Sequence, residues 1–147
     1  MIQEFCSRGE HYDDVTLIYP TAVMLAPDDL REVHALFHAH GARESVQAVV
    51  RYAMSVEHAL LRDGTGHLSP WMPDVLKQKT QDLPPKLHDT GTFAIISAEE
   101  LLADPGKLVD QQFLCYAVPR ERGIDFDEPE DLDLARLLLW GRLASRP

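Results

Sequence analysis

Two aspartates near the C-terminal end of the sequence stand at a spacing that suits metal binding. Asp125 and Asp127 flank Phe126 within the segment 123–135 (GIDFDEPEDLDLA). The apolar run 113–118 (FLCYAV) just upstream predicts a strand, and in an extended segment residues two apart project from the same face. Both carboxylates could therefore reach one point, and Mg²⁺ takes hard oxygen ligands of this kind. A plainer interpretation, in which the acids solvate a loop and cap a helix, is favoured by spacing alone.

A helix is predicted directly after the two aspartates. Glu128 occupies the cap position and Pro129 suits the first turn, while Glu130 and Asp131 place negative charge near the positive end of the helix dipole. Four apolar residues then recur at helical spacing and are expected to seat the helix on a core: Leu132, Ala135, Leu138 and Leu139.

Earlier in the chain, the pattern predicts a strand, a helix and a second strand. The β-rich run 15–19 (VTLIY) is expected to be a strand buried on both faces of a parallel sheet. A helix is predicted from Pro27 to His40, with Gly41 as its stop. Residues 46–52 (VQAVVRY) form the next predicted strand. The short connections predict a βαβ unit with a right-handed parallel crossover.

The composition is that of an ordinary globular protein. With 147 residues, 45% hydrophobic and 26% charged, the chain suits a single domain with a real core. The net charge of −10 argues against non-specific binding to nucleic acid or anionic lipid, which needs clustered cations. No apolar run reaches membrane-spanning length, and the start lacks the plan of a signal peptide. Cys6 and Cys115 form no CxxC and are interpreted as reduced thiols of a cytoplasmic protein.

The pattern changes after residue 55. His58 to Arg62 reads as a strand, residues 63–66 (DGTG) have turn chemistry, and Leu68 and Trp71 could begin a returning strand. Residues 71–87 are rich in Pro and Lys and have weak periodicity. This part of the chain is therefore predicted to be an excursion from the sheet.

Several short polar segments lie where ligands could bind. Thr21, in the segment 19–22 (YPTA), follows a predicted strand at the usual ligand edge of an α/β sheet, although a simple turn is about as consistent with these residues. Asp89 could accept hydrogen bonds from a ligand or could simply form a turn, and Gly91 allows close backbone approach. Two arginines, Arg120 and Arg122, precede the aspartate pair; they could offset its charge or meet phosphate, or form only a surface ion pair.

These segments, in this order, resemble the motifs of the cytidylyltransferases that make CMP-activated nonulosonic acids, such as the sialic, KDO-like and pseudaminic acid synthetases. GIDFDEPED resembles the DID-T-P-E-D motif, with Glu128 replacing the capping Thr. YPTA resembles YPTAP, with Val23 where the second Pro is common. KTQDLP (79–84) resembles an R-S/R-Q-D-L-P motif, with Lys79 in place of Arg. HDTGTF (88–93) resembles the H-D-A/S-G-Q-F segment of the pseudaminic-type enzymes.

The resemblance implies a fold, a reaction and a set of contacts. It implies a single domain over 1–147 with a Rossmann-like, mostly parallel, three-layer nucleotidyltransferase sheet, and an arm at 57–88 that pairs in a homodimer. Mg²⁺ on Asp125 and Asp127 would assist transfer of CMP from CTP to a nonulosonic sugar acid. Substrate contacts carried over from the motifs are Thr21, Lys79, Gln81, Asp89, Gly91, Arg120 and Arg122.

One family motif has no counterpart in the sequence. The family begins with a strand and a Gly-rich basic loop that cradles the CTP phosphates, and residues 1–14 do not resemble it. We therefore expect the chain to correspond to the C-terminal two-thirds of the enzyme, N-terminally truncated, with weak or no activity alone. The alternatives are a non-catalytic sugar-acid-binding or dimerising module and a remnant that folds without a ligand.

Three histidines lie on the predicted helix that ends at residue 40. His34 and His38 stand at i and i+4, a spacing that can chelate a metal on a helix face. The sequence places no third ligand beside them. We therefore interpret His34, His38 and His40 as partly exposed helix residues.

Overall fold

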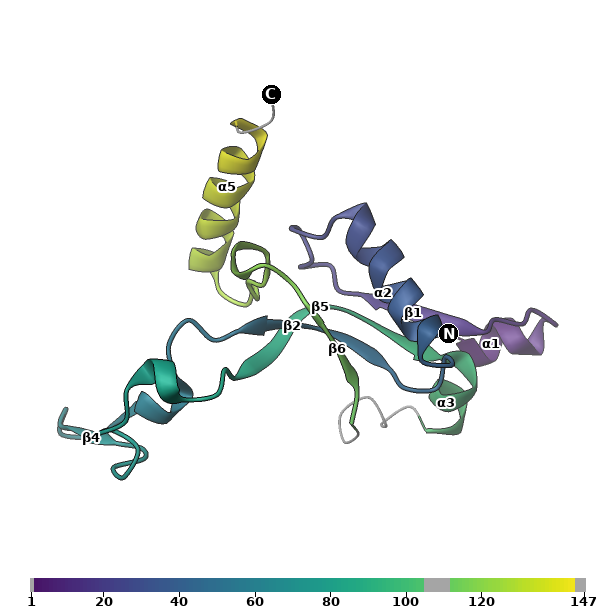
Figure 1. Cartoon of the computed structure of the whole chain (residues 1–147). Helices are drawn as coiled ribbons and strands as arrows, with labels where there is room; N and C mark the ends of the chain where they lie inside the picture. The colour runs from purple at the N-terminus through teal and green to yellow at the C-terminus, as the bar shows by residue number, and fades with distance from the viewer. Residues whose placement is uncertain (1, 105–111, 145–147) are drawn as a thin grey trace.

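A four-stranded mixed sheet forms the centre of the protein. The computed structural model describes residues 2–104 and 112–144. The strands lie in the order β1-β5-β2-β6 and are drawn in Figure 1. Their bounds are β1 (Asp14–Ile18), β2 (Val46–Arg51), β5 (Leu87–Ser97) and β6 (Leu114–Ala117).

The sheet is mostly antiparallel, so the prediction of a mostly parallel sheet is wrong. β5 lies between β1 and β2 and pairs antiparallel with both, while β2 and β6 form the one parallel pair of this sheet within the described residues. β1 and β2 do run in the same direction with α2 between them in the chain, as the predicted βαβ unit expects, but β5 lies between the two strands in the sheet. The reason lies in β5, where Phe93 to Ile96 are all buried. A strand with apolar side chains buried on both faces takes an inner position.

β1 is an edge strand of the described sheet. It pairs with β5 on one side, and its last residues, Leu17 and Ile18, are exposed. The prediction that this strand is buried on both faces is therefore wrong. Its continuous apolar composition resembles that of an inner strand, but its neighbours cover only part of it.

The helix α2 (Pro27–Ala39) covers one face of the sheet. Val33 and Phe37 on this helix are fully buried, and they form one hydrophobic cluster with Val46 on β2 and with Phe93 and Ile95 on β5. α2 ends as predicted, because the chain turns at Gly41 with a φ of +77°. The core described here is one sheet face and one helix, and the Rossmann-like three-layer arrangement stays a prediction.

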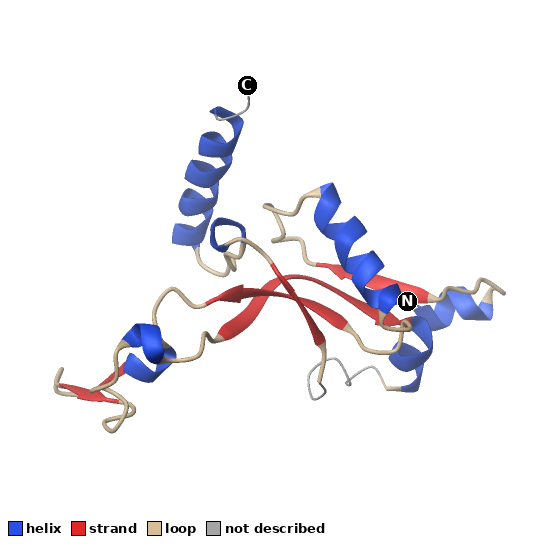
Figure 2. Cartoon of the chain, in the orientation of Figure 1, coloured by secondary structure: helices blue, strands red, loops and turns tan. Residues whose placement is uncertain are grey.

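Two short helices lie at the end of the sheet where β5 finishes. They are α1 (Ile2–Ser7) and α3 (Ala98–Ala103), which lie close together in Figure 2. The Ser97 hydroxyl accepts a hydrogen bond from the Glu100 backbone N–H at 3.1 Å, so Ser97 caps the N-terminus of α3.

The segment between β2 and β5 leaves the main sheet and carries a small hairpin of its own. The hairpin pairs β3 (Leu60–Arg62) with β4 (Leu68–Pro70) and is flanked by the 3₁₀ turns η1 (Val56–His58) and η2 (Thr80–Asp82). Its turn is the predicted one, since the Asp63 carboxylate accepts hydrogen bonds from the Thr65 and His67 backbone N–H groups. Figure 2 shows this segment projecting away from the four-stranded sheet.

The last element is α5 (Pro129–Ala144), which follows the 3₁₀ turn η3 (Arg120–Arg122). The helix begins where predicted, and the Asp131 carboxylate accepts hydrogen bonds from the backbone N–H groups of Asp127 and Glu128, which is the half of a capping box that reaches back from the first turn. Ala135 is buried as predicted. Leu132 is 48% exposed, so the prediction that Leu132 packs in the core is wrong.

Two further findings concern the cysteines and the helices. Cys6 and Cys115 are free, as predicted. None of the helices in residues 2–104 and 112–144 combines the length and apolarity needed to cross a bilayer.

Candidate active site

The loop before α5 lies against β5 at Gly91. A Cβ atom placed on Gly91 would lie 2.6 Å from Oδ1 and 2.9 Å from Cγ of Asp125. Gly91 also has a φ of +60°, a conformation that side chains other than glycine rarely adopt. The glycine therefore leaves the space that the Asp125 carboxylate occupies, and two segments predicted separately as ligand contacts meet here.

Packing against β2 brings the loop to this position. Gly123 is buried, and a Cβ atom there would lie 2.4 Å from Cβ of Val50 on β2, so only glycine allows the loop to approach the strand this closely. Next to it, the Arg122 guanidinium pairs with the buried Asp29 carboxylate on α2. The Tyr116 hydroxyl on β6 donates to the same carboxylate at 3.0 Å. Arg122, predicted as a substrate or charge-balancing contact, thus has a partner within the fold.

Negative charge gathers around Asp125. Burial raises the pKa of Asp125 above its usual value, and the charges of Asp127, Asp89 and Asp131 raise it further, against a hydrogen bond from the Phe126 backbone N–H. Among the described residues, the ion pairs include none with Asp125, Asp127 or Asp89. A cation bound here would offset a repulsion that the fold leaves in place.

The donor set fits Mg²⁺. Asp125 and Asp127 offer carboxylate oxygens, the ligands that Mg²⁺ prefers. No group of three carboxylates at this site, within the described ranges, brings its oxygens within 4.8 Å of one another. Two protein carboxylates with the remaining positions left to water and substrate phosphate is a common arrangement for Mg²⁺.

Asp89 is one of the residues that line a pocket of about 350 Å³. Gln47 on β2 donates to Asp89 Oδ2 at 2.6 Å, and the Gly91 backbone N–H donates to Asp89 Oδ1 at 3.0 Å, so the carboxylate is fixed from two sides. The pocket is lined by Leu17, Tyr19, Gln47, Asp89, Phe93, Ala94 and Phe113. The pocket therefore brings together Tyr19 of the YPTA segment and Asp89 of the HDTG segment.

Sequence reasoning missed Gln47 and Tyr19. Gln47 is a polar residue between Val46 and Ala48 in an otherwise apolar stretch, and that break in pattern could have marked it as a functional position. The YPTA motif pointed to Thr21, but Tyr19 is the residue that lines the pocket, whereas Thr21 is half-buried in the turn beyond β1.

The remaining predicted contacts lie apart from the carboxylates. Lys79 and Gln81 are exposed on the projecting segment around η2, and Arg120 is exposed in η3. None of the hydrogen bonds and ion pairs described for residues 2–104 and 112–144 joins Thr21, Lys79, Gln81 or Arg120 to Asp89, Asp125 or Asp127. Their proposed roles as substrate contacts stay predictions.

The fold and the site define an α/β protein with a cluster of carboxylates where the loop before α5 meets the inner strand β5. In sequence, the chain is similar to two proteins described as pseudaminic acid cytidylyltransferase. One is from Campylobacter jejuni serotype O:2, at 23% identity over 132 residues, and the other from serotype O:23/36, at 22% over 132 residues. In both cases the match covers 90% of this chain and 56% of the relative. The chain thus spans a little over half the length of these curated relatives, and no family model matches it.

Proposed function

We propose that this chain forms the acidic part of a cytidylyltransferase site that transfers CMP from CTP to a pseudaminic-type nonulosonic acid. The observation that carries the proposal is the contact between the Asp125 carboxylate and Gly91, with the charges of Asp127 and Asp89 close by. The similarity to the two pseudaminic acid cytidylyltransferases supports the choice of substrates.

In the proposed reaction the sugar's anomeric hydroxyl oxygen forms a bond to the α-phosphorus of CTP. The bond between that phosphorus and the oxygen that bridges it to the β-phosphorus breaks, pyrophosphate leaves with that oxygen, and the hydroxyl proton is released to water. Mg²⁺ on Asp125 and Asp127 would supply Lewis-acid stabilisation of the phosphate charge. Asp89, oriented by the Gln47 amide and the Gly91 N–H, would accept hydrogen bonds from sugar hydroxyl or amide groups in the pocket.

Calorimetric titration with CTP, with and without Mg²⁺, tests the proposal. We expect binding that requires Mg²⁺ and that is lost in Asp125→Asn. Asp133→Asn is the matched control, because Asp133 is an exposed α5 carboxylate paired with Arg136. Equal binding by the Asp125→Asn and Asp133→Asn variants, or binding of CTP independent of Mg²⁺, would contradict the assignment. If the titration shows Mg²⁺-dependent binding of CTP, turnover with candidate sugar acids is measured next.

A second candidate function is a non-catalytic dimerising module that binds a sugar acid. It is favoured by the exposed apolar side chains of the β3–β4 segment, among them Leu61, Leu68 and Trp71. This candidate expects self-association and no Mg²⁺-dependent binding of CTP. The same titration therefore separates the two functions, because self-association is compatible with both and only the first expects Mg²⁺-dependent binding of CTP.

A further inference from the structure

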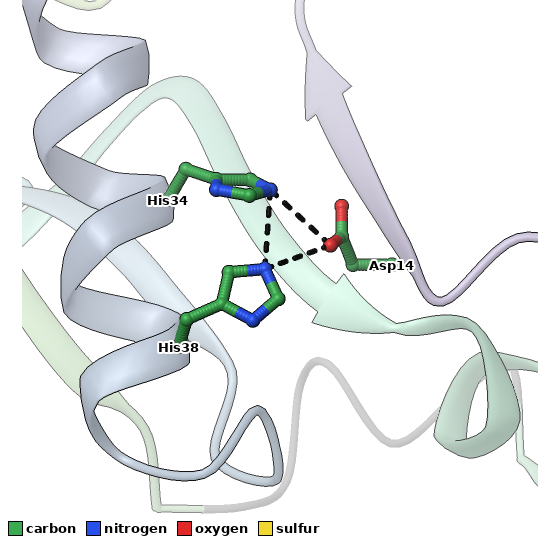
Figure 3. A group of neighbouring side chains, drawn as sticks. All are labelled: Asp14, His34 and His38. Atoms are coloured by element: carbon green, nitrogen blue, oxygen red, sulfur yellow. Dashed lines mark hydrogen bonds and ion pairs between the residues drawn. The ribbon is translucent and has the colours of Figure 1, made fainter.

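A group of three metal-ligand side chains lies where α2 crosses the beginning of β1. His34 and His38 are one turn apart on α2, and Asp14 is the first residue of β1. Figure 3 shows the three side chains pointing toward one another. Nε2 of His38 lies 3.2 Å from Nε2 of His34 and 3.2 Å from Oδ2 of Asp14, and Nε2 of His34 lies 3.3 Å from the same oxygen. Asp14, which lies on a strand twenty residues before His34, is the third ligand that the spacing of the histidines alone could not identify.

The three distances match one face of a tetrahedral metal site. In a tetrahedron, two ligand atoms are separated by about 1.6 times the metal–ligand bond. Bonds of about 2.0 Å to nitrogen and oxygen, as for Zn²⁺, therefore place the ligand atoms roughly 3.3 Å apart. The triangle formed by the two imidazoles and the carboxylate has this size without any rearrangement.

Hydrogen bonds among Nε2 of His34, Nε2 of His38 and Oδ2 of Asp14 satisfy these three atoms less well than a bound cation would. Each neutral imidazole carries one N–H, which lies in the ring plane and can point to one acceptor. If both Nε2–H groups donate to Asp14, they face each other at 3.2 Å. If one imidazole instead accepts from the other, its bare Nε2 faces the carboxylate oxygen. A divalent ion at the centre would accept all three lone pairs at once.

We propose that Asp14, His34 and His38 bind a divalent transition-metal ion of the Zn²⁺ class, with a fourth position open to water. Imidazole with one carboxylate is a ligand set for Zn²⁺ and its neighbours and a poor one for Mg²⁺ or Ca²⁺. The ion can enter from solvent, since the His34 and His38 side chains are 52% and 45% exposed.

The site formed by Asp14, His34 and His38 differs in position and in chemistry from the site around Asp125 and Asp89. Asp14 pairs with Ser97 at the end of β5, whereas Asp89 lies near the beginning of the same strand. Eight residues of extended chain separate these positions by roughly 26 Å. A metal ion on Asp14, His34 and His38 would tie the edge strand β1 to the helix that covers the sheet, so its effect falls on stability.

Zinc titration of the untagged full chain tests the proposal, with calorimetry and thermal unfolding as readouts. We expect one Zn²⁺ per chain and a higher Tm when it is bound. His38→Gln and Asp14→Asn should each weaken Zn²⁺ binding by about 100-fold or more, since even indirect partners of metal ligands contribute 10- to 100-fold. Both exchanges are at or near the surface and keep a polar side chain, so folding is checked by the Tm without metal.

His67→Gln is the matched control, because His67 is an 86% exposed histidine on the β3–β4 hairpin. It should leave Zn²⁺ affinity unchanged. Co²⁺ bound in place of Zn²⁺ should show the intense visible absorption of a tetrahedral site, and His38→Gln should remove it. The proposal is overturned if no Zn²⁺ binds, if His67→Gln weakens binding as much as His38→Gln, or if Co²⁺ shows only the weak spectrum of six-coordinate ions. None of these outcomes depends on CTP or Mg²⁺ binding.

Discussion

Gly91 and Asp125 share a crowded point, and substitution of the glycine separates two effects. We expect Gly91→Ala to cost about 1 kcal/mol of unfolding free energy, because the backbone there has a positive φ. The new methyl group would also push the Asp125 carboxylate away, and Mg²⁺-dependent CTP binding should be lost.

Gly41→Ala supplies the comparison for Gly91→Ala. Gly41 also has a positive φ, but a Cβ atom there would meet nothing within 4 Å. Chemical denaturation should give similar losses of stability for both variants, while calorimetry with CTP should show a defect in Gly91→Ala alone. A binding defect of equal size in both would mean that strain, and not the carboxylate, is responsible.

The pKa of Asp125 makes a prediction about pH. Burial and the charges of nearby aspartates raise this pKa, so the folded protein holds the Asp125 proton at pH values where the unfolded chain has lost it. The stability contributed by the protonated form is therefore lost as pH rises from the ordinary range of an aspartate through the raised pKa. Asp125→Asn should raise the Tm at pH 7 and bring little gain at pH 3. Thermal unfolding at the two pH values measures this, and a lower Tm for the variant at pH 7 would argue against it.

At the scale of elements, the ion pair between Arg122 and Asp29 ties η3 to the beginning of α2. Arg122→Ala should cost about 3 kcal/mol, because it leaves the buried Asp29 carboxylate without its cation. Arg120→Ala, two residues away and exposed, should change stability by less than about 0.5 kcal/mol. Urea denaturation of both variants measures the difference. Similar small losses would show that the pair contributes little.

The same pair has a pH signature. Burial acts to raise the pKa of Asp29, but the hydrogen bonds that its carboxylate accepts, first from Arg122, lower it overall. A depressed aspartate pKa gives stability that is present above the ordinary value and is lost as pH falls through the folded value. The stability gap between the wild type and Arg122→Ala should therefore narrow below about pH 4. A constant gap down to pH 2 would assign the loss to packing of the Arg122 side chain.

Element types and their order could be predicted from the sequence, and pairing could not. The helix beginning at Pro129, the helix stop at Gly41 and the turn at Asp63 all follow from local backbone chemistry, which neighbouring residues determine. The position of β5 between β1 and β2 depends on contacts between residues about 36 to 83 positions apart, on which periodicity carries no information. The same limit explains the site. Asp125 and Gly91 were recognised within motifs, whereas Gln47 and Asp14 gain their partners only through sheet register and helix docking.

At the scale of the whole molecule, the segment around β3 and β4 predicts association. Its hairpin leaves large apolar side chains exposed, including Leu61 and Trp71. We expect a concentration-dependent homodimer, and Trp71→Glu should raise its dissociation constant by at least about 10-fold, since buried aromatic residues dominate interfaces. Gln78→Glu adds the same charge in the same segment and should have little effect. Sedimentation equilibrium measures both, and a monomer at all concentrations would contradict the expectation.

The inner position of β5 also dictates when the protein can fold during its synthesis. β1 and β2 emerge from the ribosome early, but the strand that joins them begins only at Leu87. Until Leu87 and the residues after it have left the ribosome, β1 and β2 lack the strand that pairs with both of them. The apolar faces of β1, α2 and β2 therefore stay exposed and can associate with other chains. A nascent chain arrested before residue 87 is thus an unfinished sheet, and chaperone capture is expected to end only after Ser97 leaves the exit tunnel.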